Sequence, residues 1–172
     1  IFNLPSLCTI RYTMPNTLLI KKATIETFLT VMCYGMFFFC FQLFLNKISL
    51  SAYVPDNLTL ERWDAGIYHV LAQKGYYYHT EQDNNAGLYI LFPWVWKLLH
   101  VGVTGISFFN LVFFALGFTI VTSIYSITLS EKILWLTTPS LYFMWVPYTE
   151  ALFCLLSAIS FYGIVTKNRW LT

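Results

Sequence analysis

Residues 23–45 read ATIETFLTVMCYGMFFFCFQLFL, an apolar run whose only charge is Glu26, near its start. About twenty such residues are enough for a helix to cross the hydrocarbon core of a bilayer. The run is too long for the core of a signal peptide and has no small-residue cleavage site at its end, although an uncleaved signal anchor would look the same. We therefore expect a first transmembrane helix, TM1, at 23–45.

The composition of the whole chain is typical of a membrane protein. Hydrophobic residues make up 58% of it, aromatic residues 20% and charged residues only 10%, against roughly 25% charged in soluble domains. A net charge of +2, with Lys and Arg scattered along the chain, predicts no nucleic-acid partner. The four Cys residues show no CxxC spacing and the His residues no ligand spacing, so the sequence indicates neither a disulfide framework nor a metal site.

Two further apolar stretches follow TM1. Residues 104–129 contain no charge and predict a second span, TM2. The next stretch is too long for one crossing, and it is interrupted by Pro139 and then by Pro147 and Glu150, where a glutamate would be costly at mid-bilayer. We expect two helices there: TM3 at 133–146, which is short, tilted or kinked at the proline, and TM4 at 150–165. Because the chain starts with Ile and stops directly after a span, we expect residues 1–172 to be a single membrane domain from a longer protein.

An external loop, 46–103, joins TM1 to TM2, and we expect it to contain interfacial helices. Its last part, Ala86–His100, is apolar and aromatic but short, and Pro93 and Lys97 argue against a full crossing. Trp and Tyr prefer the headgroup level of a bilayer, which favours an interfacial or re-entrant helix. The alternative is one long bent helix that continues through 101–129.

Basic residues predict the orientation of the spans. Lys21 with Lys22, Lys132, and Lys167 with Arg169 flank ends that four alternating crossings place on one side. The positive-inside rule makes that side cytoplasmic. The polar segment 46–85 and the turn Tyr148-Thr149-Glu150 then share the external or lumenal face. These two segments are candidates for one site although they are far apart in sequence.

The polar segment contains a predicted surface helix over 62–74. Its apolar residues have the spacing of a helical stripe: Trp63, Ile67, Val70 and Leu71. Asp64 falls in the first turn, where unpaired backbone N–H groups and the helix dipole favour an anion. An ionised Asp64 can accept a proton from a substrate hydroxyl. The alternative is that Asp64 only caps its helix, and Glu150 equally can be no more than an N-terminal charge for 151–165.

Three ordered blocks of residues carry a likeness to a known family. They are Arg62-Trp63-Asp64-Ala65 through Ala72-Gln73-Lys74-Gly75-Tyr76, then Leu91-Phe92-Pro93, then Pro139-Ser140 with Tyr148-Thr149-Glu150-Ala151-Leu152-Phe153. Their order and spacing resemble the PIG-V mannosyltransferases, which add the second mannose of glycosylphosphatidylinositol anchors in eukaryotes and have bacterial relatives. The resemblance covers roughly residues 62–165. Thr138 and Thr149 depart from the Asn and Ser of the family pattern.

The resemblance implies an all-α, multi-pass membrane protein, the N-terminal part of a GT-C type glycosyltransferase. It implies a mannose or related hexose carried on polyprenyl phosphate as donor, a lipid-linked or glycan acceptor, inversion at the sugar carbon, and no cofactor or metal. Asp64 occupies the position of the catalytic acid that orients or deprotonates the acceptor. The expected substrate-binding residues are Arg62, Trp63, His69, Lys74, Tyr148 and Glu150, and His79 is a further candidate near the leaving phosphate.

Two other protein classes would have the same number of spans. If the chain were a transporter, we would expect ionisable residues inside its spans. The residues 27–45, 101–130 and 133–149 contain no Asp, Glu, Lys or Arg. A structural membrane subunit predicts that Asp64 can be replaced without loss of function. For the enzyme, the sequence favours a bacterial plasma membrane, or the endoplasmic reticulum membrane in a eukaryote, with membrane lipids as neighbours.

Overall fold

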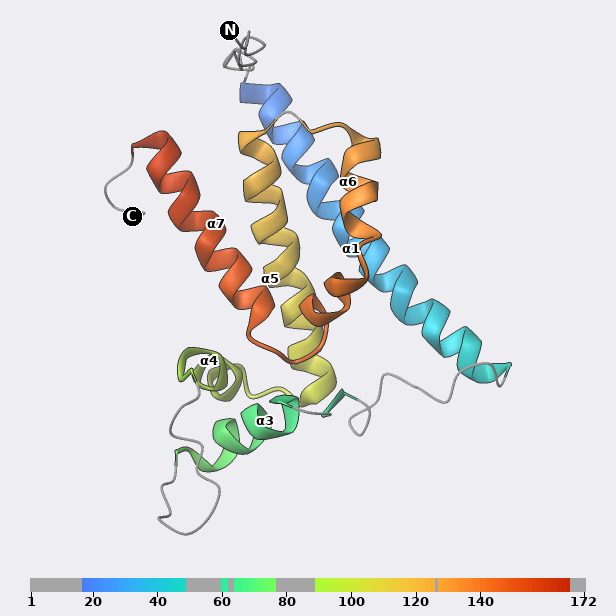
Figure 1. Cartoon of the computed structure of the whole chain (residues 1–172), viewed down its shortest axis with the longest axis vertical. Coiled ribbons are helices and arrows are strands. Elements are labelled where there is room, and N and C mark those ends of the chain that lie inside the picture. The colour runs from blue at the N-terminus through green and yellow to red at the C-terminus, as the bar shows by residue number, and fades with distance from the viewer. Residues whose placement is uncertain (1–16, 49–59, 62–63, 77–88, 126, 168–172) are drawn as a thin grey trace, which may run out of the picture.

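The structure, a computed structural model, describes residues 17–48, 60–61, 64–76, 89–125 and 127–167, with side chains from residue 23 onward. Every element within these ranges is a helix (Figure 1), which confirms the all-α class. The helix α1 spans Thr17–Lys47 and α5 spans Val103–Ile124. Both are long and apolar enough to cross a membrane. The helix α5 ends before residue 129 because a new helix is capped at Thr128.

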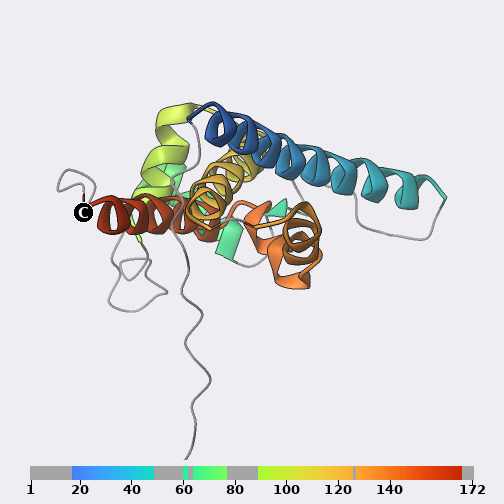
Figure 2. The same ribbon diagram turned by 90° about the horizontal axis from the view of Figure 1, so that it is seen from above.

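The helix α5 lies between α1 and α7 (Glu150–Thr166) and packs on both, as the view along its axis shows (Figure 2). Glycine lets the helices approach closely: a Cβ atom at Gly117 would lie 3.1 Å from the backbone of Leu155 in α7. At Gly35 in α1 the added atom would lie 2.5 Å from the side chain of Leu111 in α5. Small residues at such crossings are typical of helices that pack in membranes.

The predicted TM3 segment is not one helix. The helix α6 covers Leu129–Leu136, and a 3₁₀ helix, η1, covers Pro139–Met144. Thr128 begins α6 with a capping box, in which its side chain and that of Glu131 bond each other's backbone N–H groups. Pro139 cannot continue α6, since it has no N–H to donate to the preceding turn, and it begins η1 instead.

Lys132 attaches α6 to α1. Its side chain is buried, and its Nζ donates a hydrogen bond to Thr27 Oγ1 over 2.6 Å. Thr27 in turn donates to the backbone oxygen of Ala23 at 2.8 Å. This end of the bundle also holds the end of α5 and the end of α7 (Figure 1). Of the other basic residues used for the orientation, Arg169 and the side chains of Lys21 and Lys22 lie outside the described part of the chain.

Two short helices, α3 (Asp64–Lys74) and α4 (Leu91–Leu99), pack against each other at the opposite end of the bundle (Figure 1). Since α4 is a helix separate from α5, the structure agrees with the expected separate helix in this segment rather than with one long bent helix through 101–129. The break between them comes at His100, which has a left-handed φ of 51°, followed by extended backbone at Gly102. Trp96 closes the break by donating from its Nε1 to the Val101 oxygen at 2.8 Å.

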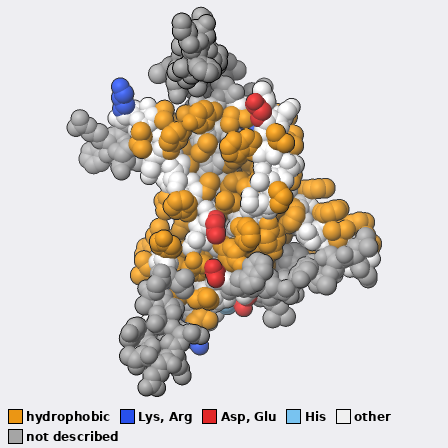
Figure 3. All heavy atoms as spheres, in the orientation of Figure 1, with side chains coloured by type: hydrophobic (Ala, Val, Ile, Leu, Met, Phe, Trp, Pro, Cys, Tyr) orange, Lys and Arg blue, Asp and Glu red, His pale blue; other side chains and the backbone are white. Residues whose placement is uncertain are grey.

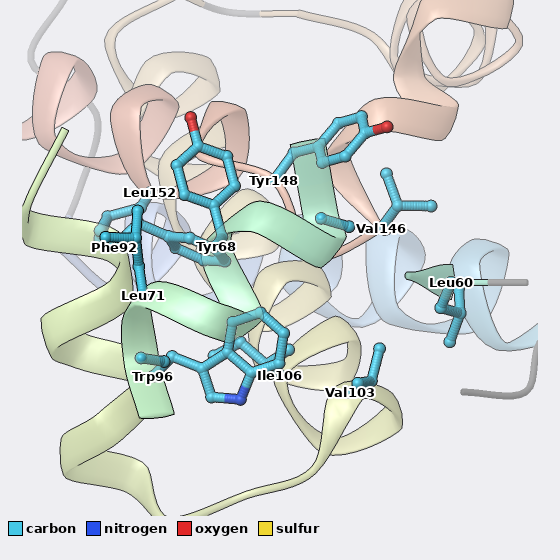
Figure 4. Packing of buried hydrophobic residues seen from close by; sticks show 12 residues of the cluster. Leu60, Tyr68, Leu71, Phe92, Trp96, Val103, Ile106, Val146, Tyr148 and Leu152 are labelled. Carbon is cyan, nitrogen blue, oxygen red and sulfur yellow. The ribbon is translucent and has the colours of Figure 1, made fainter. Parts of the chain in front are cut away.

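A cluster of buried side chains joins α3 and α4 to the start of α5 and the start of α7 (Figure 4). Phe92 and Ile106 are almost wholly buried in it, and burying a side chain of this size stabilises a fold by about 1.5–3 kcal/mol. Tyr68 of α3 meets Phe92 edge to face, with ring centroids 5.6 Å apart. The cluster therefore fixes α3, which carries Asp64, against the segment that leads into α7.

The buried face of α3 differs from the predicted stripe. Ile67 and Val70 are exposed, at 43% and 37%, and Leu71 alone of the described stripe residues is buried. The buried residues are instead Ala65, Tyr68, Leu71 and Ala72. The small alanines let α3 lie close to its neighbours while Tyr68 reaches Phe92, so the face is chosen by packing rather than by hydrophobicity alone.

Candidate functional site

Two carboxylates that are far apart in sequence begin two helices at the same end of the bundle. Asp64 is the first residue of α3 and Glu150 the first of α7, and both are exposed. Both act electrostatically on the same two tyrosines, Tyr68 and Tyr148. On the face seen in Figure 3, acidic side chains lie near one another in a surface that is mostly hydrophobic. The structure thus brings the polar segment and the Tyr148–Glu150 turn together.

Tyr68 links α3 to the start of α7. Its ring is buried, and its hydroxyl points away from the packed side chains (Figure 4) and lies beside the side chain of Thr149. Burial raises the pKa of Tyr68, the Thr149 hydroxyl lowers it in part, and the negative charges of Asp64 and Glu150 raise it again. Tyr68, like any phenol of ordinary or raised pKa, is protonated at neutral pH and is a hydrogen-bond donor near the two acids.

Tyr148 is the second tyrosine on which both acids act. Burial, with a further contribution from Asp64 and then Glu150, raises its pKa to about 12. Its ring stacks on Phe143 of η1, with centroids 5.8 Å apart and planes 13° from parallel. Its hydroxyl points away from the cluster (Figure 4). Protonated phenols beside carboxylates, with aromatic faces at hand, suit the binding of a polyol such as a sugar.

A buried amide in α5 holds the turn that carries Tyr148. Asn110 is 0% exposed, and its Nδ2 donates to the backbone oxygens of Val146 and Tyr148. The turn is tightened by a hydrogen bond from the Tyr148 N–H to the Val146 oxygen at 2.7 Å. Sequence reasoning missed Asn110 as well as Tyr68. The available signal was an amide inside an uncharged span, where a polar group needs a partner.

His69 is engaged by other protein groups. Its Nδ1 donates to Glu61 Oε1 over 2.6 Å, and its Nε2 accepts from the Gln73 amide at 2.8 Å. Its ring also stacks on Trp96, with centroids 5.0 Å apart and planes 10° from parallel. These contacts make His69 a link between the segment before α3, α3 itself and α4, and the prediction that it binds substrate stays a prediction.

Of the remaining predicted site residues, the structure describes only Lys74, and it lies away from Asp64. Lys74 is the last residue of the eleven-residue α3, so it lies roughly 15 Å along the helix axis from Asp64. This is too far for both to contact one small group. Arg62, Trp63 and His79 lie outside the described residues. The residues that the structure does bring together are Asp64, Glu150, Tyr68, Tyr148 and Thr149, and we call these five residues the acid–tyrosine site.

The chemistry available at this site is that of carboxylates and phenols. Within the described ranges, no three His, Cys, Asp or Glu side chains gather closely enough to hold a metal ion. Asp64 begins a helix, where the unpaired N–H groups of the first turn and the helix dipole stabilise its negative charge, and Glu150 has the same environment in α7.

Comparisons of the chain with models of protein families, with curated proteins and with solved structures found no match.

Proposed function

We propose that this chain belongs to a multi-pass membrane glycosyltransferase that moves mannose, or a related hexose, from polyprenyl phosphate to a hydroxyl of a lipid-linked or glycan acceptor. The observation that carries the proposal is that Asp64 and Glu150 begin two helices whose first turns meet in one buried cluster, which includes Tyr68 and Tyr148. Two exposed carboxylates with phenol donors near them match the needs of a sugar hydroxyl. The three sequence blocks that resemble the PIG-V mannosyltransferases give the same reaction class.

In the proposed reaction Asp64 acts as the base. The acceptor oxygen attacks the anomeric carbon, the bond from that carbon to the phosphate oxygen breaks, and the acceptor proton passes to the Asp64 carboxylate. The leaving polyprenyl phosphate is a stable anion and needs no proton to depart. Attack opposite the leaving group inverts a β-linked donor to an α-glycoside. General base catalysis of this kind typically contributes about 10²–10⁴-fold to a rate.

Glu150 and the two tyrosines bind and orient the sugar in this proposal. A carboxylate accepts hydrogen bonds from sugar hydroxyls, while a protonated tyrosine donates to sugar oxygens. A phenol with the ordinary pKa of about 10 is protonated at neutral pH, and burial and the two acids raise the pKa values of Tyr68 and Tyr148 further. His69 supports the fold of the site from the far side of α3 through Glu61 and Trp96.

The membrane arrangement is part of the proposal. The helices α1, α5 and α7 cross the bilayer, with α6 and η1 together making the return between α5 and α7. The helices α3 and α4 lie at the non-cytoplasmic surface, where a lipid-linked sugar is presented. The exposed side chains Tyr89, Trp94 and Leu98 around α4 suit the interface, where aromatic residues concentrate. The membrane is a bacterial plasma membrane, or that of the endoplasmic reticulum if the source is eukaryotic.

Glycosyl transfer in membranes containing the full-length protein tests this function. Radiolabelled polyprenyl-phosphate mannose is supplied, and labelled lipid and glycan products are measured for the wild type, Asp64→Asn and Glu26→Gln. Glu26 is an exposed acid of α1, so its variant is the matched control. We expect Asp64→Asn to lose about 10²-fold or more of the rate at equal abundance and Glu26→Gln to keep it. Equal labelling in all samples and in empty membranes, with other polyprenyl-linked sugars also inert, would reject the enzyme in favour of a transporter or structural subunit.

A further inference from the structure

Asn110 is an unusual residue for its position in the fold. It lies in α5, among side chains such as Ile106, Leu111 and Phe114 that are almost fully buried. An amide removed from water in such surroundings is costly unless its groups are hydrogen-bonded. Its Nδ2 meets half of this need by donating to two backbone oxygens of another segment, those of Val146 and Tyr148, whereas its Oδ1 is buried with no hydrogen-bond partner among the described residues. The amide is therefore a direct bond between α5 and the turn before α7.

The turn that Asn110 holds leads directly into Glu150. Pro147 lies between the two bonded carbonyl groups and is among the most buried side chains. Thr149, the cap residue of α7, makes no side-chain cap bond and lies beside the Tyr68 hydroxyl, and the Tyr68 ring packs in one buried cluster with Tyr148 and Leu152. The start of α7 is thus fixed from α5 by an amide and from α3 by a tyrosine. Both attachments lie within a few residues of the Glu150 carboxylate.

We propose that Asn110 is a positioning residue, which sets the place of the Glu150 carboxylate relative to Asp64 without touching substrate. This inference rests on the proposed function. Two hydrogen bonds from Asn110 fix the position of the turn relative to α5, so their loss lets the first residues of α7 shift. A misplacement of about 1 Å in a catalytic site can lower a rate by about 10²-fold. Asn110 is therefore as important to transfer as a residue in contact with the sugar.

Asn110→Leu removes the two hydrogen bonds while keeping the branching of the side chain at Cγ, and Ser107→Ala is its matched control. Ser107 is buried one turn earlier in α5, and its hydroxyl bonds only its own helix, at the Val103 oxygen. We expect kcat to fall by about 10- to 100-fold in Asn110→Leu, and KM for the donor to rise as well, because the displaced Glu150 is also a sugar-binding group. Ser107→Ala should behave as the wild type. An Asn110→Leu enzyme with unchanged kcat would overturn the proposal.

A second background separates positioning from a loss of folding. If Asn110 acts through Glu150, then Asn110→Leu should cost little further rate in a Glu150→Gln enzyme, because residues that act as a unit are not additive. A general weakening of the fold would instead lower the rate by the same factor in both backgrounds. That multiplicative result would overturn the positioning role.

A cross-linking measurement tests the geometry without any activity. In a chain whose cysteines are replaced by alanine, Asp64→Cys and Glu150→Cys are treated with bismaleimides of graded length, with and without Asn110→Leu. We expect Asn110→Leu to lower the yield of the short cross-link sharply, while each thiol still reacts with a single maleimide at its former rate. An unchanged yield would overturn the proposal. If the yield falls but the wild type transfers no sugar from any donor, the positioning geometry stands and the proposed function fails.

Discussion

The contact at Gly117 offers a quantitative test of how the bundle is packed. In Gly117→Ala the new Cβ atom would lie 3.1 Å from Cα and N of Leu155 and 3.3 Å from the carbonyl carbon of Cys154. Ordinary carbon contacts are about 3.5–4.0 Å. Since these neighbours are backbone atoms of α7, they cannot rotate away, and the two helices must separate by several tenths of an ångström.

The expected cost follows from two opposing effects. Overpacking in a tight core costs about 1–3 kcal/mol, and alanine recovers up to about 1 kcal/mol over glycine in a helix. We therefore expect Gly117→Ala to lower the free energy of unfolding by about 1 kcal/mol, and Gly117→Val to lower it further. Gly102→Ala is the control, because a Cβ atom at Gly102 would meet no described atom within 4 Å.

The assay is the titration of detergent-solubilised protein with sodium dodecyl sulfate, followed by tryptophan fluorescence. The midpoint should fall in the order wild type, Gly117→Ala, Gly117→Val, with Gly102→Ala close to the wild type. Because Leu155 lies in α7, whose first residue is Glu150, the same variants should also weaken the acid–tyrosine site. Equal midpoints for the wild type and both Gly117 variants would refute the close approach of α5 and α7.

Three further outcomes follow from the contacts at the site. Thr149→Val removes the hydroxyl that lowers the pKa of Tyr68, so that pKa should rise further. Ultraviolet titration of the phenols checks this, with Tyr68→Phe to identify the signal, and an unchanged titration would contradict it. Tyr148 has its pKa raised to about 12 from an unfolded value of about 10, so between these pH values the folded state holds a proton that the unfolded state has lost. The contribution of Tyr148 to stability is therefore complete below pH of about 10 and disappears as the pH rises towards about 12. Detergent unfolding over this pH range should show a loss of stability in the wild type and a smaller loss in Tyr148→Phe. Equal losses in the two proteins would disprove this expectation. Glu61→Gln weakens the ion pair with His69 by about 0–1 kcal/mol, as expected for a partly exposed pair. Protease should then cleave α3 faster while the transfer rate is unchanged. A large loss of transfer would contradict a purely structural role for this ion pair.

Much of the helical layout could be predicted from the sequence, because apolar runs and prolines act locally. The uncharged runs predicted the long helices α1 and α5, and Asp64 marks the start of α3 as expected. Pro139 predicted an interruption, which the structure resolves into α6 and η1. The proximity of Asp64 to the Tyr148–Glu150 turn followed from counting alternating spans, and the structure brings these segments together.

The missing parts depend on contacts between distant segments. Asn110 is one polar residue in an apolar run, and nothing in its neighbours shows that its partners are the carbonyls of Val146 and Tyr148. His69 looked available for a substrate because its engagement by Glu61 and Trp96 is a property of the folded chain. The buried face of α3 could not be predicted either, since it is set by close packing of small residues rather than by a stripe of large ones.

The most direct test of the central claim is a double-mutant cycle on transfer from polyprenyl-phosphate mannose, with the wild type, Asp64→Asn, Glu150→Gln and the double variant in membranes at equal abundance. If the two acids act on one substrate in one site, each single variant should lose most of the rate, and the double variant should lose little more than the worse of the two. Losses that multiply would place the acids in independent roles, and wild-type rates in both single variants would contradict the account.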